Sequence, residues 1–242
     1  MICDYAGYDY KKEFWEKADR AYEDACERRT LTKLLKKVPR ADTLLDAGCG
    51  FGRLFPTYQP FGDQILLMDY ALNMLQQAKS ELPKSVHYVS GNLMALPFQS
   101  ETVNTVVSIR TLHHVTRPED FFSDVARILK PGGAFIMEIP NQRHILNILR
   151  FLSGRLKQNP FSKTPIRYRD AFINFNPSAI YPLLQQAGFQ IAAKRSTSFF
   201  RHRFFKKWLP TSLLVGLDSF FQALFSPLSL TPSLYILCRK EL

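Results

Sequence analysis

Four kinds of feature are missing from this sequence of 242 residues, and each absence excludes a class of protein. No stretch contains about 18 uninterrupted apolar residues, so we expect no membrane-spanning helix. The four cysteines are scattered, without a Cys-x-x-Cys pair, which argues against a zinc site or a disulfide framework and favours a reducing compartment. The first residues are polar and aromatic, unlike a secretory signal peptide, and internal repeats are absent. We therefore expect a cytoplasmic globular protein without a metal site.

Acidic residues are nearly missing from one long stretch. Between residues 140 and 209 the sequence has 13 Lys and Arg but only one acid, Asp170, whereas the rest of the chain carries 19 basic and 20 acidic residues. The excess of positive charge therefore lies entirely in this stretch. Such asymmetry indicates an anionic partner, and a solvated basic face is the alternative.

The segment Leu44–Arg53 reads Leu-Leu-Asp-Ala-Gly-Cys-Gly-Phe-Gly-Arg. Its apolar start predicts a short buried strand that ends at Asp46, and three glycines follow at alternate positions. Because glycine lacks Cβ, this turn can bend sharply and lie against a ligand, and open α/β sheets bind ligands at this end of their strands. A dinucleotide fingerprint would need glycine where Arg53 stands, and the acid disfavours a phosphate ligand.

Leu44–Arg53 resembles motif I of the class I S-adenosylmethionine-dependent methyltransferases. The similarity continues at intervals with an apolar strand that ends in Asp69, and with the segments Gly91–Phe98, Leu112–Val115 (Leu-His-His-Val) and Leu129–Gly133 (Leu-Lys-Pro-Gly-Gly). The resemblance implies an α/β, Rossmann-like fold. We expect a seven-stranded, mostly parallel sheet with helices on both faces and an antiparallel last strand.

The resemblance also implies the cofactor, S-adenosyl-L-methionine, and the residues that hold it. Asp69 would accept bonds from the ribose hydroxyls, and Tyr70 would lie beside the adenine. Asn92 stands where the family commonly has an acid, and its carbonyl oxygen can still accept a bond from the adenine amino group. The other expected contacts are Asp46, Ala47, Gly48, Cys49, Gly50, Gly52, Met74, Leu93, Ile109 and Arg110.

Residues 1–40 predict an N-terminal helical cap. Apolar residues recur at helical spacing from Phe14 to Ala25, and Thr30 predicts the start of a second helix. In the family, N-terminal helices cover the cofactor, which makes four residues candidates to reach it: Tyr10, Trp15, Arg20 and Tyr22. Ordinary helix packing is the alternative.

Two adjacent histidines, His113 and His114, follow the apolar run Val103–Ile109, which predicts the fourth strand. Methyl transfer needs no metal, and a base is needed only when the acceptor must lose a proton. His114 is the candidate catalytic base and His113 the weaker candidate, although one histidine of such a pair usually packs. Arg110 or the basic stretch would instead hold an acidic substrate. The segment is not the Asn-Pro-Pro-Tyr element by which methyltransferases of nucleobase amines grip their substrate, which disfavours that class.

Two insertions, 141–176 and 199–230, flank the sixth predicted strand, and the family resemblance implies that they form substrate lids. The second insertion interleaves basic residues with Phe, Trp and Leu. Three interpretations stay open for it: a helical cap that buries its apolar face on the sheet, contact with an anionic membrane, or binding of nucleic acid.

The sequence as a whole predicts one methyltransferase domain over residues 1–242, with the cofactor-binding core at 41–140. The favoured function is methylation of a small-molecule or lipid-like acceptor, at oxygen or carbon. An RNA methyltransferase and a non-catalytic, cofactor-binding scaffold are the alternatives. We expect a cytoplasmic location, with peripheral attachment to the inner face of a membrane as an open alternative and nucleic acid disfavoured as a partner.

Overall fold

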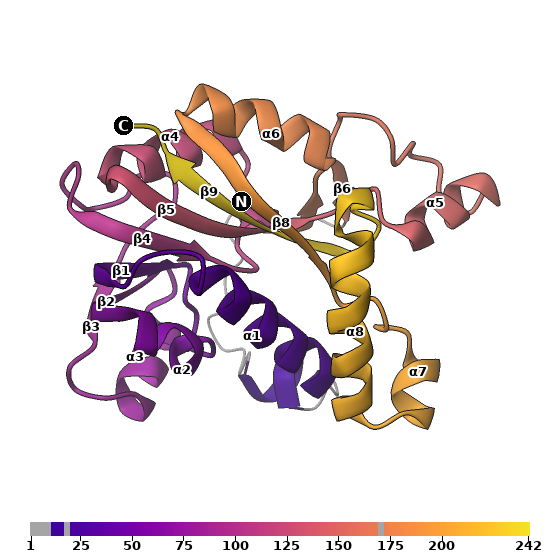
Figure 1. Ribbon diagram of the computed structural model, residues 1–242, viewed down its shortest axis with the longest axis horizontal. Helices are drawn as coiled ribbons and strands as arrows, with labels where there is room; N and C mark the ends of the chain where they lie inside the picture. The colour runs from indigo at the N-terminus through magenta and orange to yellow at the C-terminus, as the bar shows by residue number, and fades with distance from the viewer. Residues whose placement is uncertain (1–10, 17–19, 169–171) are drawn as a thin grey trace.

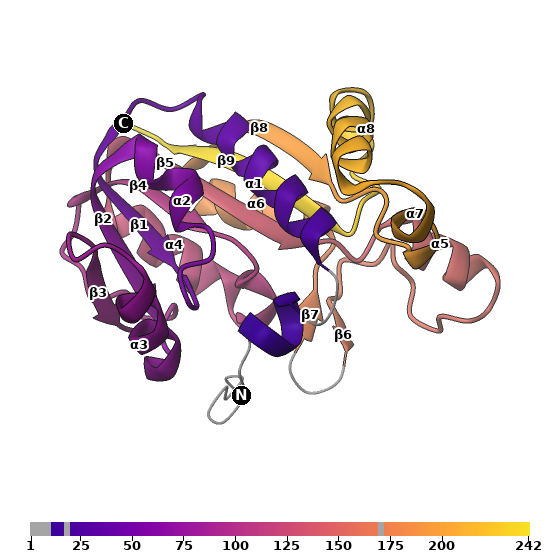
Figure 2. The same ribbon diagram turned by 90° about the horizontal axis from the view of Figure 1, so that it is seen from below.

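The computed structural model describes residues 11–16, 20–168 and 172–242. Its centre is a seven-stranded sheet of order β3-β2-β1-β4-β5-β9-β8 (Figures 1 and 2). Neighbouring strands from β3 to β5 are parallel, whereas β9 is antiparallel to both β5 and β8. The predicted Rossmann-like fold with an antiparallel last strand is confirmed. The strands are β1 (Ala41–Ala47), β2 (Gly62–Asp69), β3 (His87–Ser90), β4 (Val103–Ser108), β5 (Leu129–Pro140), β8 (Phe189–Thr197) and β9 (Ser233–Lys240).

Helices cover both faces of the sheet, which is why its central strands are continuous apolar runs. Leu45 and Val106 pack in one core cluster with α4 and α6, and Leu44 and Val107 pack in a second cluster with α1, α2 and α3. Figure 1 shows these two layers above and below the sheet. The covering helices are α1 (Ala21–Leu35), α2 (Phe55–Tyr58), α3 (Leu72–Glu81), α4 (Pro118–Ile128) and α6 (Pro177–Gln186).

The remaining elements gather at one end of the sheet (Figure 2). Helix α5 (Ile145–Leu152) follows β5, and helices α7 (Arg203–Trp208) and α8 (Thr211–Phe225) follow β8. Because β5 and β8 are both antiparallel to β9, their carboxyl ends lie at the same edge. A small hairpin of β6 (Ile166–Tyr168) and β7 (Phe172–Asn174), which the sequence did not predict, joins them there.

Two residues at helix positions show how caps form in this chain. Asn176 caps α6, because its Oδ1 accepts a bond from the Ser178 amide at 3.1 Å. The expected helix start at Thr30 is wrong, since α1 runs through it without a break. The Thr30 hydroxyl instead donates to Thr197 Oγ1 at 3.1 Å and accepts from Gln222 Nε2 at 2.8 Å, so it joins α1 to β8 and α8.

The second insertion packs by polar and apolar contacts. Buried Asp218 and Gln222 of α8 face α1 and β8, and buried Leu214 packs with Tyr22 and Cys26 of α1. Phe220 and Leu224 of α8 are exposed, so the cap buries only part of its apolar side. Within the described residues, no helix is long and apolar enough to cross a membrane.

Candidate active site

The glycine turn after β1 forms the floor of a cavity. Gly48, Gly50 and Gly52 have φ angles of 86°, 56° and 75°, a region that residues with a Cβ rarely adopt. A Cβ at Gly48 would stand 2.1 Å from Thr111 Cγ2, so this glycine permits close packing. A Cβ at Gly50 would meet no atom within 4 Å, which means that the Gly50 backbone is open to a ligand.

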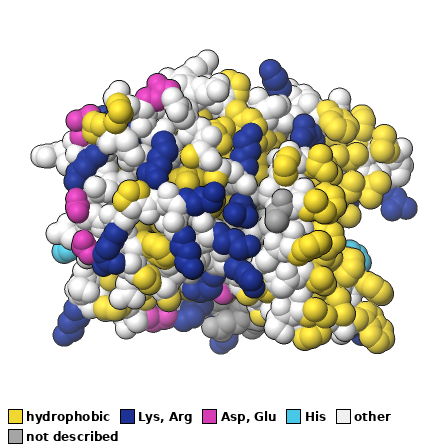
Figure 3. All heavy atoms as spheres, in the orientation of Figure 1, with side chains coloured by type: hydrophobic (Ala, Val, Ile, Leu, Met, Phe, Trp, Pro, Cys, Tyr) yellow, Lys and Arg dark blue, Asp and Glu magenta, His cyan; other side chains and the backbone are white. Residues whose placement is uncertain are grey.

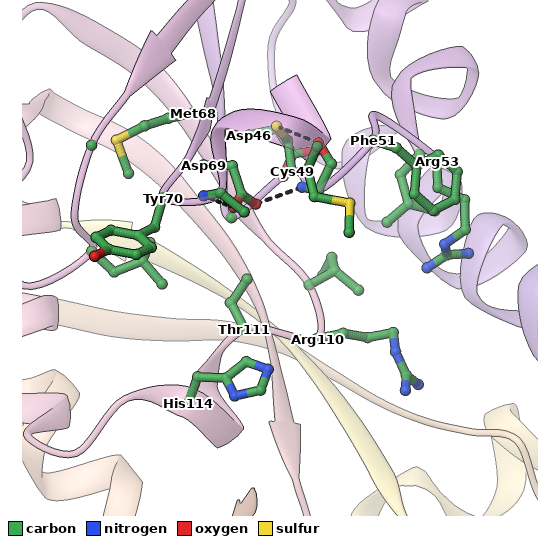
Figure 4. A pocket seen from close by; sticks show the side chains of 18 of the residues that line it. Asp46, Cys49, Phe51, Arg53, Met68, Asp69, Tyr70, Arg110, Thr111 and His114 are labelled. Carbon is green, nitrogen blue, oxygen red and sulfur yellow. Dashed lines mark hydrogen bonds between the residues drawn. The ribbon is translucent and has the colours of Figure 1, made fainter. Parts of the chain in front are cut away.

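The cavity lies at the carboxyl ends of β1, β2 and β4 and has a volume of about 980 Å³, its open mouth included. Twelve of the predicted site residues line it: Trp15, Asp46, Gly48, Cys49, Gly50, Asp69, Tyr70, Met74, Leu93, Ile109, Arg110 and His114. Figure 4 shows Asp69 and Cys49 on one side of the cavity and Thr111 and His114 across from them. Residues far apart in sequence thus meet here because parallel strands end at one edge.

Asp69, the last residue of β2, bridges the glycine turn and the start of α3. Its Oδ2 accepts from the Gly50 amide at 2.7 Å and its Oδ1 accepts from the Ala71 amide at 2.9 Å. Burial raises the pKa of Asp69, although these amide bonds oppose the rise. A carboxylate has about four lone-pair sites, and the amides of Gly50, Ala71 and Tyr70 leave room for about one further bond.

Asp46, at the end of β1, is the deeper acid of the cavity. It is 3% exposed, and its Oδ2 accepts from the Tyr58 hydroxyl at 2.7 Å. Burial raises the pKa of Asp46 to about 7, with the nearby Asp69 adding to the rise and the Tyr58 bond opposing it. Near neutral pH this carboxyl can therefore exchange a proton or accept a cationic group.

Two arginines of the cavity wall share one buried acid. Glu27 of α1 accepts from Arg53 Nη2 at 2.6 Å and from Arg110 Nη1 at 3.3 Å. Burial raises the pKa of Glu27, but the arginines more than offset this effect, so the pKa lies below its ordinary value. The Arg53 guanidinium also lies over the Trp15 ring, 3.7 Å from its centroid, and Trp15 lines the cavity. The N-terminal segment is thereby tied to the cavity.

Arg110 occupies a backbone position that few side chains tolerate. Its φ is 60°, in the left-handed region, which costs a non-glycine residue about 1–2 kcal/mol. Its amide donates to Glu138 Oε2 at 3.2 Å, and burial raises the pKa of Glu138. Strain of this kind persists where the surroundings fix the backbone, and it is concentrated at functional sites.

The two histidines lie on a short turn of 3-10 helix, η3 (Leu112–His114), and face different surroundings. His114 lines the cavity, whereas His113 does not. The His113 ring stacks on Phe172 of β7 with centroids 5.2 Å apart, and burial holds the pKa of His113 well below its usual value. Phe172 also contacts the His114 ring, at 5.4 Å. His113 is therefore a packed, neutral side chain.

Some predicted residues lie away from the cavity. The Tyr22 hydroxyl donates to Asp218 at 2.9 Å and accepts from the Phe200 amide at 2.9 Å, so Tyr22 joins α1 to α8. Asn92 Oδ1 accepts from the Met94 amide at 2.9 Å. Ala47, Gly52 and Arg20 are likewise not among the lining residues, and Tyr10 is outside the described residues.

The structure adds lining residues that sequence reasoning did not single out. They are Phe51, Arg53, Leu54, Met68, Ala71, Gly91 and Thr111. Each is adjacent in sequence to a predicted residue or within a few positions of one, so proximity to the strand ends was the available signal. Within the described residues, no cluster of three or more His, Cys, Asp or Glu could hold a metal ion.

The cavity suits a nucleoside that carries a cationic group. Asp69 can still accept a bond from a hydroxyl, and Asp46 offers a second carboxyl deeper in the cavity. Met68 and Leu93 provide apolar surface for a base, and Gly50 leaves the space that a side chain would fill. These residues fit S-adenosylmethionine.

Comparisons with known proteins agree with this fit. Residues 45–137 match a family described as "Methyltransferase domain". A protein of Mycolicibacterium smegmatis named a probable S-adenosylmethionine-dependent methyltransferase is 28% identical over 61% of this chain and 52% of its own length. A demethylmenaquinone methyltransferase of Renibacterium salmoninarum is 27% identical over 46% of each chain. The chain thus spans about half the length of these curated relatives.

The fold has solved counterparts. The crystal structure of an S-adenosylmethionine-dependent methyltransferase from Mesorhizobium loti superposes with a TM-score of 0.65, covering 91% of this chain and all of that chain at 19% identity. The glycine turn and the two strand-end acids, Asp46 and Asp69, lie within the matched segment. The parallel strands β2, β3 and β4 lie within it as well. Residues 45–137 of this chain therefore match the methyltransferase domain family, and the whole chain has the fold of a solved S-adenosylmethionine-dependent methyltransferase.

Proposed function

We propose that this chain transfers the methyl group of S-adenosylmethionine to a small-molecule or lipid-like acceptor, at oxygen or carbon. In this proposal Asp69 accepts a bond from a ribose hydroxyl and Asp46 interacts with the cationic part of the cofactor. Tyr70 and Leu93 lie beside the base. These assignments rest on the positions of the side chains in one cavity.

The observation that carries the proposal is the position of His114. It lines the cavity across from the glycine turn (Figure 4), and it contacts Phe172, which belongs to a hairpin outside the cofactor-binding strands. His114 therefore stands between the cofactor cavity and the segment that follows β5. An acceptor that approaches from that segment meets His114 before it meets the cofactor.

When bound, S-adenosylmethionine supplies a methyl group on a positively charged sulfur, and the electrons of the broken carbon–sulfur bond return to sulfur as the acceptor atom attacks. The chain itself must hold the two reactants in line, which is worth several kcal/mol. The His114 imidazole takes the proton of an acceptor hydroxyl or acidic carbon as the new bond forms. Arg53, Arg110 and Trp15 close the N-terminal side of the cavity and limit access of water.

A second hollow adjoins His114 and supports an acceptor with a polar or acidic group. It lies between α5 and the β6–β7 hairpin and is lined by His144, Asn147, Arg150, Tyr168, Phe172 and Asn174. Phe172 belongs to this hollow and also touches His114. His144 is 8% exposed, and burial lowers its pKa to about 4, so its ring is neutral near pH 7. Arg150 supplies the positive charge for an acidic acceptor.

The relatives give limited support for the acceptor class. The Renibacterium salmoninarum relative is named for demethylmenaquinone, which favours a small molecule over a nucleic acid. The basic residues after position 140 favour the RNA alternative only through net charge. The proposed acceptor class therefore rests on the residues that line the hollow between α5 and the β6–β7 hairpin.

Calorimetric titration with S-adenosylhomocysteine, the demethylated product, tests the cofactor half of the proposal. We expect binding in the micromolar range. The purified chain would next be incubated with methyl-labelled S-adenosylmethionine and with small-molecule, lipid or RNA extracts. Label in the small-molecule or lipid fraction supports the proposal, and label in RNA contradicts it. Binding without transfer to any extract favours a scaffold.

The His114→Ala variant tests the role of the base. We expect turnover about 100-fold below wild type, because a positioned base contributes about that much, with unchanged affinity for S-adenosylhomocysteine. His87→Ala is the matched control, because His87 is exposed on β3 and lies outside the cavity. Equal turnover of His114→Ala and wild type at every pH would remove His114 as the base.

A further inference from the structure

Helix α5 exposes most of its large apolar residues and buries the polar residue Asn147. Ile145, Leu146, Leu149 and Leu152 are between 41% and 72% exposed. Asn147 is 1% exposed, and its amide group donates to Gln142 O at 3.0 Å and to Tyr168 Oη at 2.9 Å. A surface helix of a soluble domain has the opposite arrangement. The apolar side of α5 therefore lacks a partner within the described residues.

Helix α8 repeats this arrangement in part, and α7 also exposes large apolar residues. In α8, Phe220 and Leu224 are 66% and 59% exposed, whereas Asp218 on the opposite side is fully buried. In α7, Phe204 and Trp208 are 61% and 68% exposed. Since large apolar side chains exposed together mark an interaction site, these two helices and α5 call for a common explanation.

The three helices form one continuous apolar surface, which we call the apolar edge. Figure 3 shows hydrophobic side chains gathered along one side of the molecule, over α5, α8 and α7. The start of α5 is joined to the segment after α8, because the Ile145 amide donates to Leu230 O at 2.9 Å and Arg143 Nη2 donates to Leu228 O at 3.4 Å. The apolar edge is thus held together by the fold.

Positive charge surrounds the apolar edge. Arg155 and Lys157 are exposed just after α5, and Arg203 and Lys207 are exposed on α7. Among the described residues between 141 and 230, the only acid is Asp218, which is buried. Exposed apolar and aromatic side chains bordered by Lys and Arg match an interface that is apolar inside and anionic at its surface, which is the chemistry of an anionic bilayer.

The apolar edge also lies on the side from which an acceptor reaches the cavity. It follows the carboxyl ends of β5 and β8, and the cavity lies at the carboxyl ends of β1, β2 and β4. Helix α5 further borders the hollow that adjoins His114 through Phe172. A bilayer at the apolar edge would therefore lie next to this hollow.

We infer that the apolar edge docks this protein on the surface of an anionic lipid bilayer, with α5, α7 and α8 seated in the headgroup region and Arg155, Lys157, Arg203 and Lys207 against lipid phosphates. Attachment is peripheral, since none of the described helices can span a membrane. This binding is independent of methyl transfer, so it can be tested without an acceptor.

The test is co-sedimentation of the full chain with vesicles of phosphatidylcholine alone or of phosphatidylcholine with phosphatidylglycerol. We expect binding to the anionic vesicles to be at least about tenfold tighter than to the neutral ones and to weaken with salt. Trp208 gives a second signal, because its fluorescence should shift to shorter wavelength on binding. The Trp208→Phe variant should bind the vesicles normally, but the contribution of Trp208 to the fluorescence shift should be absent.

Two sets of variants separate the apolar and the charged contributions. The triple variant Leu149→Ser, Phe220→Ser and Leu224→Ser should bind anionic vesicles at least about tenfold more weakly. The variant with Arg155, Lys157, Arg203 and Lys207 each changed to Gln should lose the preference for anionic lipid. The matched controls are Leu242→Ser for the first set and Lys36→Gln with Lys84→Gln for the second, because these residues are exposed away from the apolar edge.

Several outcomes would overturn the inference. The first is wild-type chain that stays in solution with anionic vesicles, and the second is a triple variant that binds them as well as wild type does. A dimer that the triple variant abolishes, without vesicle binding, would assign the apolar edge to a second copy of this chain. Salt-sensitive binding of an RNA oligonucleotide without vesicle binding would assign the surrounding charge to nucleic acid.

Discussion

Helices α4 and α8 face the rest of the molecule with opposite kinds of side chain. In α4, Phe121 and Phe122 are buried in the core and Arg127 is exposed. In α8, Asp218 is buried and Phe220 is exposed. Both helices lie against the same sheet or its edge, so the difference comes from what each helix packs on. Helix α4 covers an apolar sheet face, whereas α8 meets polar groups of α1 and β8.

Helix α4 thus buries its large apolar residues in the core, whereas α8 leaves part of its apolar surface in contact with water. Each Å² of apolar surface that stays in contact with water forgoes about 25 cal/mol. Helix α8 is held by the packing of Leu214 on α1 and by the hydrogen bonds of Asp218 and Gln222. The chain thus keeps the apolar side of α8 available for a partner, and the following predictions test this interpretation.

The largest effect is expected from truncating a buried aromatic in α4. Phe122→Ala should lower the free energy of unfolding by about 3–5 kcal/mol, because it removes burial and leaves a cavity. Phe220→Ala in α8 should change it by less than about 0.5 kcal/mol, because that ring is mostly in water already. Urea denaturation monitored by circular dichroism measures both. Equal costs would mean that the Phe220 ring is buried in solution, and the contrast between the helices would fail.

The next largest effect concerns the polar contact of α8. Asp218 accepts from the Tyr22 hydroxyl at 2.9 Å, the Phe199 amide at 2.8 Å and Gln222 Nε2 at 2.9 Å. Asp218→Ala leaves these donors unpaired and should cost about 3 kcal/mol of unfolding free energy. The control is Asp120→Ala on α4, whose surface pair with Arg117 contributes at most about 1 kcal/mol. A cost no larger than that of the control would show that the polar contact does not hold α8.

A smaller effect should separate cofactor binding from membrane binding. Asp69→Ala should weaken binding of S-adenosylhomocysteine by about 1–3 kcal/mol, the cost of an unpaired hydroxyl, and should leave vesicle binding unchanged. Asp63→Ala, at the exposed start of the same strand, is the control. Calorimetry measures the first effect and co-sedimentation the second. Unchanged cofactor affinity would remove the ribose assignment of Asp69.

The smallest effect is a pH dependence at Asp46. Burial raises its pKa from 3.8 to about 7, so the folded chain holds this proton between about pH 4 and 7 while the unfolded chain has released it. This group therefore makes the free energy of unfolding fall as pH rises through that window. Because the ionised carboxyl binds a cation better, affinity for S-adenosylhomocysteine should fall below pH 7, by at most about tenfold per pH unit. Asp46→Asn should flatten both profiles, and identical profiles would contradict the role of Asp46.

The sequence predicted the cavity residues that lie at strand ends. Asp46 and Asp69 each end an apolar run, and Gly48 and Gly50 follow directly, so their place at one edge of the sheet follows from parallel topology. Arg53 and Thr111 were missed, although each adjoins a predicted residue. Nothing local marks Phe172, which reaches His114 from a hairpin that the sequence did not predict.

The error at Tyr22 has a physical cause. Helical periodicity correctly placed Tyr22 on a buried side of α1, but periodicity does not identify the partner that buries it. The partner is Asp218, which lies 196 residues away in sequence. Trp15 lines the cavity instead, because its ring lies against Arg53. Contacts between residues so distant follow from the packing of whole elements.

Local sequence pattern was sufficient for the glycine turn and the strand-end acids, because short-range backbone preferences and the periodicity of burial set them, whereas the seven-stranded sheet was expected from the family resemblance. The orientation of α5 and α8 could not be obtained in this way. Their amphipathic patterns indicated two sides but not which side faces inward, and a cap with its apolar side on the sheet was an equally valid expectation. The folded chain settled the orientation through buried partners: the Asp218 network holds α8, and the bonds of Asn147 hold α5. Without the polar side of α8, the buried hydroxyls of Tyr22, Thr30 and Thr197 would lack these partners, and an unpaired buried polar group is costly.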